Sequence, residues 1–394
     1  MPSAKPTPEP VATLPWDTVL GWRMRRQHLD RRAPAADLLR VASDLCGLHA
    51  QVTSSADLTL WARLDGHTPG ALETALWDDR TLVKTWAMRG TLHLLPTAEY
   101  GDYLALLSHR PENTTKPAWL RGFRITAEQM QTLLATVPKA LDGEPLSRSE
   151  LADAVVTISG DASLAEHLGH SWGALLKPSA SRGDLCFAPG EGQRVKFTRP
   201  HRWLGGWEHV DAGVGMRAVL RRFLATYGPV TRDDVARWLG ITSAPAAMRL
   251  LESLGDELTC VAIAGTGDAH WMLAADLDEL RGSAPSTAVR LLPGFDQYVV
   301  TSPRDREAIL PQAHRAQIHR PQGWISPVLC IGGVFRGVWK HERKGRNVRI
   351  EVAPFGKVTR AEQRGIVTEA ERLGAYLDAT PDLTIHAPGK VALF

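Results

Sequence analysis

The sequence has few of the residues that mark several large classes of protein. Its four cysteines, Cys46, Cys186, Cys260 and Cys330, are separated by 70 or more residues. No closely spaced pair is therefore available to bind zinc or to exchange disulfides. The sequence also lacks an apolar run of about eighteen residues, the length that a membrane-spanning helix needs. These absences exclude zinc-ribbon, thiol-redox and membrane-spanning proteins, and they predict a protein of the reduced cytoplasm.

Strong net charge and cofactor-binding loops are absent as well. The net charge is +3 and the pI is about 8.7, so any affinity for nucleic acid must come from a local basic patch. Neither a Gly-x-x-x-x-Gly-Lys-Ser/Thr loop nor a Gly-x-Gly-x-x-Gly loop occurs, which leaves nucleotide cofactors without a binding motif. No cluster with metal-ligand spacing is present either. We therefore expect no cofactor and no metal.

What the sequence does contain is typical of a globular protein with several domains. The 394 residues are 44% hydrophobic and 23% charged, which is close to the globular average and allows two to four separate cores. Residues 1–14 are rich in Pro, Ala and Thr without an apolar stretch, and they predict a disordered tail rather than a signal peptide.

One supersecondary plan recurs along the chain, three helices followed by a two-stranded hairpin, which is the winged-helix pattern. The predicted fold class is mainly α with small β elements (α+β), with three tandem winged helices. Ser147 and Glu150 predict the start of one helix, because Ser at the N-cap and Glu three residues later form a capping box. The expected units are winged helix 1 at 15–97, a helical linker at 98–145, winged helix 2 at 146–210, winged helix 3 at 211–283 and a strand-rich domain at 284–394.

The chemically most informative stretch is Leu45–Gln51, which is followed by Val52–Asp57. Its apolar beginning, Gly47 and a Ser/Thr/Asp-rich end predict a place between the end of one helix and the start of another. His49 and Gln51 are two residues apart, so in an extended backbone the imidazole and the carboxamide point the same way. Two such groups can hold one water. The plainer alternative is a hydrogen-bonded, half-buried histidine followed by a polar loop residue.

This stretch resembles the catalytic Gln-x-Gln motif of the AlkZ-like (YcaQ-like) winged-helix DNA glycosylases. The family more often has Gln where this chain has His49. Further similar segments follow in the family's order over nearly the whole chain: Trp86–Leu94, Tyr227–Thr231, Ala236–Gly240, Leu291–Asp296 and Gly333–Trp339.

The resemblance implies an activity, a partner and a fold for the last domain. Residues 284–394 would form the family's small C-terminal β-barrel, His49 and Gln51 would be catalytic, and the partner would be double-stranded DNA with alkylated bases. Alkylation at N7 makes a purine cationic, so it leaves as a neutral base and needs little acid catalysis. We therefore expect a monofunctional DNA glycosylase, acting on bulky N7-alkylguanine adducts of the kind that DNA-reactive antibiotics produce, in repair or self-resistance.

Basic residues in four places are candidates for contact with DNA. Each place has an alternative role: a solvated helix face, a cap on a strand pair, a hinge between domains, or protection of an exposed strand edge. The candidates are Arg23, Arg25 and Arg26 in the basic helix 16–32, Arg89 at a hairpin turn, Arg199 and Arg202 after the second wing, and Lys340, Arg343, Lys344 and Arg346 in a C-terminal hairpin.

The alternative to a glycosylase is a protein of another class, a non-enzymatic winged-helix transcriptional regulator. Regulators of this type are usually dimers on palindromic sites, whereas this sequence has no coiled-coil heptads or apolar dimerisation helix. We therefore expect a monomer, located in the cytoplasm with the bacterial nucleoid.

Overall fold

The computed structural model describes residues 8–110, 114–171, 173–192, 194–205, 207–241, 243–303 and 306–389. Of the tail predicted for residues 1–14, residues 1–7 lie outside this description. The end of that segment is not a free tail, because β1 (Thr13–Leu14) pairs in parallel with β10 (Leu258–Ile263). Backbone hydrogen bonding to β10 already begins at Val11.

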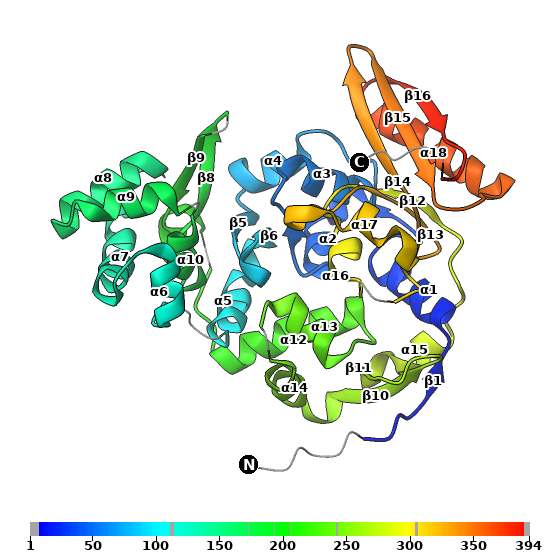
Figure 1. Ribbon diagram of the computed structural model, residues 1–394, viewed down its shortest axis with the longest axis horizontal. Coiled ribbons are helices and arrows are strands. Elements are labelled where there is room, and N and C mark those ends of the chain that lie inside the picture. The colour runs from blue at the N-terminus through cyan, green and yellow to red at the C-terminus, as the bar shows by residue number, and fades with distance from the viewer. Residues whose placement is uncertain are drawn as a thin grey trace. The chain divides into compact units, whose positions relative to one another are not determined.

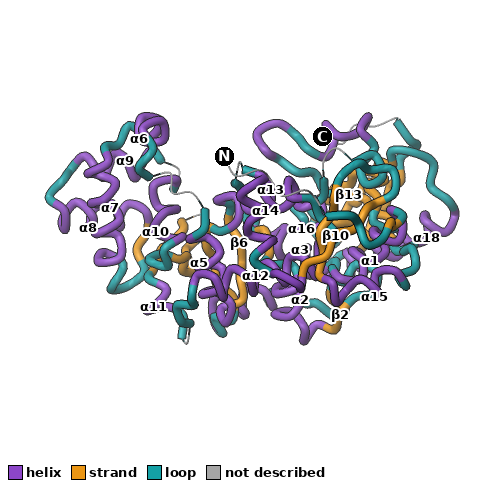
Figure 2. Tube along the Cα trace, turned by 90° about the horizontal axis from the view of Figure 1, so that it is seen from below, coloured by secondary structure: helices purple, strands orange, loops and turns teal. Residues whose placement is uncertain are grey.

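The chain forms two compact units, each assembled from segments that are distant in sequence (Figure 1). Unit 1 consists of residues 1–71, 220–238 and 243–394, and unit 2 consists of residues 72–219 and 239–242. Both contain helices and small groups of strands (Figure 2), in agreement with the predicted mixture of α and β structure. The tandem winged-helix organisation and its boundaries remain a prediction.

Unit 1 holds the first helices of the chain and nearly all of its C-terminal half. Its helices are α1 (Trp16–Arg26), α2 (Leu38–Asp44), α3 (Thr53–Trp61), the second half of α12 (Ala212–Tyr227), most of α13 (Arg232–Leu239), α14 (Ala244–Glu252), α15 (Leu277–Arg281), α16 (Gln297–Thr301), α17 (Arg315–Ile318) and α18 (Arg360–Tyr376). Its smaller strands are β2 (Ala33–Pro34), β3 (Leu48–His49), β4 (Leu64–Asp65) and β11 (Ala269–Leu273), with β10 between β1 and β11 and β2 parallel to β4.

The predicted C-terminal β-barrel is wrong for the described residues. Five strands form an open sheet in the order β12-β13-β14-β15-β16, with β12 and β16 at its edges. They are β12 (Val289–Leu292), β13 (Val328–Ile331), β14 (Val334–Lys344), β15 (Asn347–Pro354) and β16 (Thr380–Ile385). The helix α18 packs against both edge strands, β12 and β16. Because a helix covers the apolar surface, the sheet does not need to close on itself to bury it.

The largest core of unit 1 joins α1 and α3 to this sheet. Leu20, Met24 and Trp61 from the N-terminal helices belong to the same buried cluster as the apolar side chains of β12 to β15. Trp339 of β14 is fully buried, and its indole Nε1 donates to the carbonyl oxygen of Leu292 at 2.7 Å. The N-terminal helices and the C-terminal sheet are thus one folding unit.

Unit 2 is mainly helical, with two small sheets. Its helices are α4 (Ala71–Glu73), α5 (Tyr100–Ser108), α6 (Pro117–Phe123), α7 (Ala127–Ala140), α8 (Arg148–Ser159), α9 (Ser163–His170), α10 (Lys177–Ser181) and α11 (Pro200–Trp203). Its strands are the antiparallel pair β5 (Leu82–Trp86) and β6 (Leu92–Pro96), and the sheet β7 (Leu146–Ser147), β9 (Arg194–Thr198) and β8 (Cys186–Glu191) in that order.

The local sequence explains several of these boundaries. The capping box predicted at Ser147 is confirmed: its hydroxyl accepts from the Glu150 amide at 3.4 Å, and the Glu150 carboxylate accepts from the Ser147 amide at 2.7 Å. Two of the four free amides at the start of α8 are satisfied in this way. The predicted hairpin around Arg89 is also confirmed as β5 and β6.

Candidate active site

The motif of His49 and Gln51 lies between α2 and α3, as its composition predicted. After α2 ends at Asp44, the chain turns sharply because Cys46 and Gly47 both have left-handed backbone conformations, with φ of 56° and 86°. Glycine adopts this conformation readily, whereas a residue with a side chain does so rarely. The turn delivers His49 at the end of β3, four residues before the start of α3 at Thr53.

His49 is held face to face with an aromatic ring. Its side chain is buried, at 6% exposure, and its imidazole stacks on Phe295 with ring centroids 5.2 Å apart and planes 7° from parallel. Phe295 itself has a left-handed backbone, with φ of 60°, and its ring also contacts Trp324 at 5.4 Å. The stack restricts rotation of the imidazole, so a water or sugar atom would meet a ring of defined orientation.

Gln51 differs from His49 in being exposed, while Ala50 between them is fully buried. The motif therefore presents a buried imidazole and, two residues further on, a carboxamide open to solvent. A carboxamide offers both a hydrogen-bond donor and an acceptor, and a neutral imidazole offers one of each. This combination can orient a water and accept its proton without any carboxylate.

Side chains from later segments of unit 1 hold the backbone of the loop that precedes His49. The hydroxyl of Tyr227 donates to the carbonyl oxygen of Leu45 at 2.7 Å, and the side-chain amide of Gln297 donates to that of Gly47 at 2.6 Å. The hydroxyl of Thr226 donates to the carbonyl oxygen of Asp44. Gln297 has no exposed surface, so its hydrogen bond to the loop is shielded from competing water.

Gln297 is positioned by a buried ion pair next to it. The carboxylate of Asp296 accepts two hydrogen bonds from Arg63 of unit 1, at 2.7 and 2.8 Å, and both side chains are fully buried. Asp296 also caps α16 by accepting from the Tyr298 amide at 2.9 Å. Residues 295–297 thus combine the ring stacked on His49, the ion pair with Arg63 and the hydrogen bond that holds the loop.

Sequence reasoning did not identify Arg63 or Gln297. Asp296 appeared only as the end of a segment similar to the family, Leu291–Asp296. A Pro-Gly turn followed by an aspartate at a helix N-cap was the available signal, but it predicts a turn and a helix rather than a contact with a loop about 250 residues earlier in the chain.

The arginines predicted to contact DNA from α1 bind other parts of unit 1. Arg23 is buried, donates to the carbonyl oxygen of Pro229 at 2.6 Å, and has a pKa lowered by that burial. Arg25 donates to the carbonyl oxygen of Ala284 at 3.0 Å. Both guanidinium groups are therefore engaged in holding α1 in place.

Arg26 on the same helix is engaged in the same way. It forms ion pairs with Asp276 and Glu279 at 2.8 and 2.9 Å, and its guanidinium lies 4.1 Å from the ring centroid of Trp22. The basic α1 helix is thus a packed structural element. A solvated helix face, the alternative role for these arginines, does not describe the helix, and its contact with DNA stays a prediction.

The arginines of unit 2 that are predicted to contact DNA have more varied surroundings. Arg199 is the residue before α11 and pairs with Asp142 at 3.1 Å, and the exposed Arg202 lies 4.0 Å from the same carboxylate. Arg89 lies at the turn between β5 and β6, with φ of 58°. A Cβ on Gly240 would come within 2.7 Å of the Arg89 Cα, so that glycine allows close backbone packing against the turn.

The C-terminal candidates lie on the long hairpin β14–β15, and most of them are exposed. Arg343, Lys344 and Arg346 surround its exposed turn, whereas Lys340 is half-buried and pairs with Glu351 at 3.3 Å. Lys344 pairs with the exposed Glu342 of the same strand, at 3.3 Å. Among the sites predicted to contact DNA, this turn in unit 1 leaves its cations most accessible to a phosphate.

The described residues contain neither a candidate metal site nor a helix that could span a membrane. No group of three or more His, Cys, Asp or Glu side chains is arranged to hold a metal ion in that part of the chain. In the same residues, no helix has both the length and the apolar character required to cross a membrane.

Comparison with known proteins gives one consistent result. The family model described as "DNA glycosylase AlkZ-like" matches residues 42–376. The chain is 36% identical over 360 residues to the interstrand DNA cross-link repair glycosylase of Streptomyces sahachiroi, covering 90% of this chain and 94% of that protein. Its structure is similar to Streptomyces sahachiroi DNA glycosylase AlkZ, with a TM-score of 0.85, 35% identity, and coverage of 95% of this chain and all of that one. The family resemblance of the motifs is thereby confirmed: the chain belongs to the AlkZ-like DNA glycosylase family.

Proposed function

We propose that this DNA glycosylase hydrolyses the N-glycosidic bond of N7-alkylated purines, above all bulky N7-alkylguanine adducts, including those that link the two strands of DNA. The observation that carries the proposal is the motif itself, in which a buried His49 is stacked on Phe295 and followed by an exposed Gln51. The relative of similar length that is named for repair of interstrand DNA cross-links supports the choice of bulky, crosslink-forming lesions.

The charge on the lesion determines how much catalysis the site must supply. When the bond between C1′ and N9 breaks, its electron pair neutralises the positive charge of an N7-alkylated purine, and the base leaves as a neutral molecule. An uncharged base would need protonation by a strong acid. The carboxylate next to Phe295 in the chain, that of Asp296, is held in an ion pair with Arg63. The site therefore suits a cationic leaving base.

In the proposed mechanism His49 and Gln51 act on the attacking water and the sugar. Gln51 accepts a hydrogen bond from the water and orients its oxygen towards C1′, where positive charge develops. His49, in its neutral form, accepts the proton that the water loses as the new C1′–O bond forms. The carboxamide and imidazole dipoles also stabilise the oxocarbenium-like transition state.

We further propose that the enzyme is monofunctional. A glycosylase that also cleaves the strand uses a lysine to form a Schiff base with the sugar. No lysine is among the residues that stack on His49 or fix its loop. Of the two lysines closest to family segments, Lys340 is paired with Glu351, and the Nζ of Lys84 lies over the ring of Phe187, 5.8 Å from its centroid.

The direct test is incubation of the full-length protein with duplexes that carry one defined N7-guanine adduct or one N7–N7 crosslink. We expect release of free adducted base and an intact abasic strand, which breaks only after alkali or a lyase is added. Base release is followed by mass spectrometry, and strand integrity by denaturing electrophoresis with and without alkali. A covalent complex trapped by borohydride would refute monofunctionality. Absence of release together with strong preference for one undamaged sequence would favour the regulator.

The exposed turn of β14–β15 leads to a prediction about DNA binding. We expect Arg343→Gln with Arg346→Gln to weaken binding to all duplexes alike, and to reduce the slope of log K against log salt by about one unit per lost phosphate contact. The measurement is binding to an undamaged duplex at several salt concentrations. Arg26→Gln is the matched control, because that arginine is paired within unit 1. A slope that changes for Arg26→Gln and not for the hairpin variant would contradict the assignment.

A further inference from the structure

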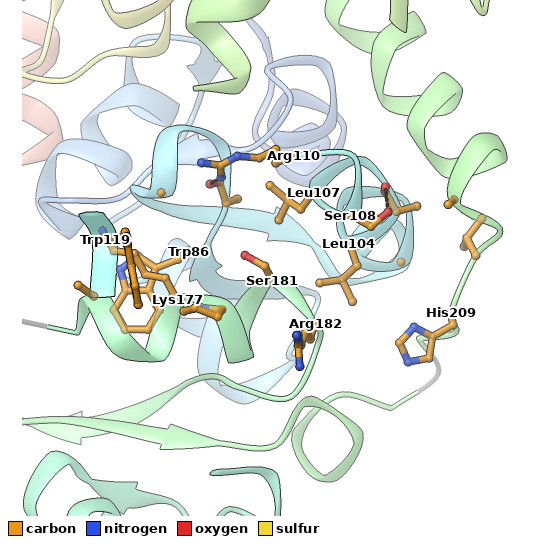
Figure 3. A pocket seen from close by; sticks show the side chains of 18 of the residues that line it. Trp86, Leu104, Leu107, Ser108, Arg110, Trp119, Lys177, Ser181, Arg182 and His209 are labelled. Carbon is orange, nitrogen blue, oxygen red and sulfur yellow. Dashed lines mark hydrogen bonds between the residues drawn. The ribbon is translucent and has the colours of Figure 1, made fainter. Parts of the chain in front are cut away.

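Unit 2 contains a cavity of about 590 Å³ between the β5–β6 turn, α5, α6 and α10 (Figure 3). Its volume lies within the range of sites that bind small molecules. Every lining residue belongs to unit 2, so the cavity does not include His49 or Gln51. The side chains on which its chemistry depends are Trp86, Trp119, Phe123, Arg110 and Lys177.

Arg110 and Lys177 line the cavity and have no acidic partner among the described residues. Arg110 and Lys177 are each half-buried, and burial lowers the pKa of both; Arg110 lowers the pKa of Lys177 further, because two like charges are close together. No carboxylate of the described residues forms an ion pair with either side chain. The only hydrogen bond of Arg110 within the described residues joins its Nη1 to the carbonyl oxygen of Ala87, at 3.2 Å.

This arrangement destabilises the protein unless an anion binds. Partly buried charges lose hydration, and their mutual repulsion is stronger there than in water. The Nζ of Lys177 lies 3.7 Å from the position that a Cβ on Gly90 would occupy, so this cation rests against the turn that carries Arg89. A ligand with two or more negatively charged oxygens would bridge Arg110 and Lys177 and offset their repulsion.

The same cavity has an aromatic wall. Trp119 and Phe123 of α6 are each half-buried, with ring centroids 4.7 Å apart. In the view of Figure 3, Trp86, Trp119 and Lys177 occupy one end of the cavity. Trp86 also lines the cavity, and its ring packs edge-on against Phe187. Partly exposed aromatic rings beside cations are the combination by which proteins bind a base and its phosphate.

We propose that this cavity is a nucleotide-binding subsite, in which Arg110 and Lys177 bind a phosphate and Trp119 and Phe123 contact the attached base. The inference rests on the proposed function only in taking DNA as the natural source of the nucleotide. A free mononucleotide has the same chemistry, and the experiment separates the two sources. His49 and Gln51 do not line this cavity, and the proposal assigns to it a nucleotide other than the one whose bond is cleaved.

The test is calorimetric titration of the full-length protein with thymidine monophosphate, thymidine, inorganic phosphate and a single-stranded thymidine hexanucleotide. We expect the monophosphate to bind at least about tenfold more tightly than thymidine or phosphate alone, since only it engages both halves of the subsite. Tighter binding of the hexanucleotide assigns the subsite to a DNA strand, and binding of the monophosphate alone assigns it to a free nucleotide. Absence of saturable binding by either nucleotide would overturn the proposal.

Substitutions in the cavity test which residues bind the nucleotide. Arg110→Gln with Lys177→Gln should lower nucleotide affinity at least about tenfold, and Trp119→Ala should lower affinity for the monophosphate while leaving that for inorganic phosphate unchanged. The matched control, Arg194→Gln with Lys139→Gln, makes the same change of charge at exposed positions of unit 2. Equal losses in the two double variants would overturn the proposal.

Folding is checked by thermal unfolding of each variant. The melting temperature of Arg110→Gln with Lys177→Gln should be no lower than that of the wild type, because the substitution removes a repulsion. If that variant fails to fold, Trp119→Ala provides the test alone. None of these measurements depends on base release. If the protein binds nucleotide but releases no base, the proposed function is refuted and the subsite stands. If it releases base but binds no nucleotide, the subsite is refuted and the proposed function stands.

Discussion

Replacing Gln51 with alanine is expected to lower the rate of single-turnover base release by about tenfold to a thousandfold. The exposed carboxamide is the group of the motif that reaches solvent, and in the proposed mechanism it places the attacking water at C1′. Its removal leaves the water unoriented while His49 keeps its stack on Phe295. Binding of the damaged duplex should change much less, because a water-orienting group contributes mainly in the transition state.

The measurement is the rate of adduct release with enzyme in excess over a duplex carrying one N7-guanine adduct. Ser54→Ala is the matched control, since Ser54 is also an exposed polar residue, three positions further along at the start of α3. A Gln51→Ala rate within twofold of the Ser54→Ala rate would remove Gln51 from the mechanism, and with it the assignment of the motif.

His49→Gln provides the complementary comparison, because it restores the residue more common in the family. Glutamine can orient a water but cannot accept a proton at neutral pH. If His49 is the base, wild-type base release should fall as the pH drops through the range in which histidine becomes protonated. His49→Gln should flatten that profile and keep part of the rate. An unchanged rate and profile would reduce His49 to a second hydrogen-bond partner of the water.

The sequence predicted well those features that depend on neighbouring residues. The position of Leu45–Gln51 between two helices, the capping box at Ser147 and the β5–β6 hairpin each follow from residues that are close together in the chain. Periodicity, caps and turn residues are local signals, and they were sufficient there. The position of the candidate catalytic motif could therefore be read from the chain alone.

The surroundings of the motif depend on residues far apart in the chain, and local patterns do not contain them. Gln297 contacts Gly47 across 250 positions, and Arg26 meets Glu279 across 253. In sequence, a cluster of arginines on a helix looks the same whether its partners are phosphates or carboxylates of the same protein. The barrel was predicted wrongly for a related reason, since strand segments alone do not show that a helix such as α18 will cover the sheet.

The buried pair of Arg63 and Asp296 leads to the largest expected effect on stability. Asp296→Ala should lower the free energy of unfolding by about 3–5 kcal/mol, because it leaves the Arg63 guanidinium fully buried without its counter-charge. The exposed pair of Asp278 and Arg281, 3.4 Å apart with Asp278 at 95% exposure, gives the control. Asp278→Ala should cost about 0.5 kcal/mol or less, since solvent screens such pairs. Denaturant titration of both variants gives the two values.

A second variant separates loss of the ion pair from loss of the anchor. Arg63→Met with Asp296→Leu should recover much of the stability lost in Asp296→Ala, because no unpaired charge remains buried. It should not recover base release, since Gln297 and Phe295 would still lack the anchor that fixes them against the loop of His49. Rates measured well below each melting temperature distinguish these effects. If the stabilised double variant regains wild-type base release, the ion pair serves folding alone and the orientation of His49 does not depend on it.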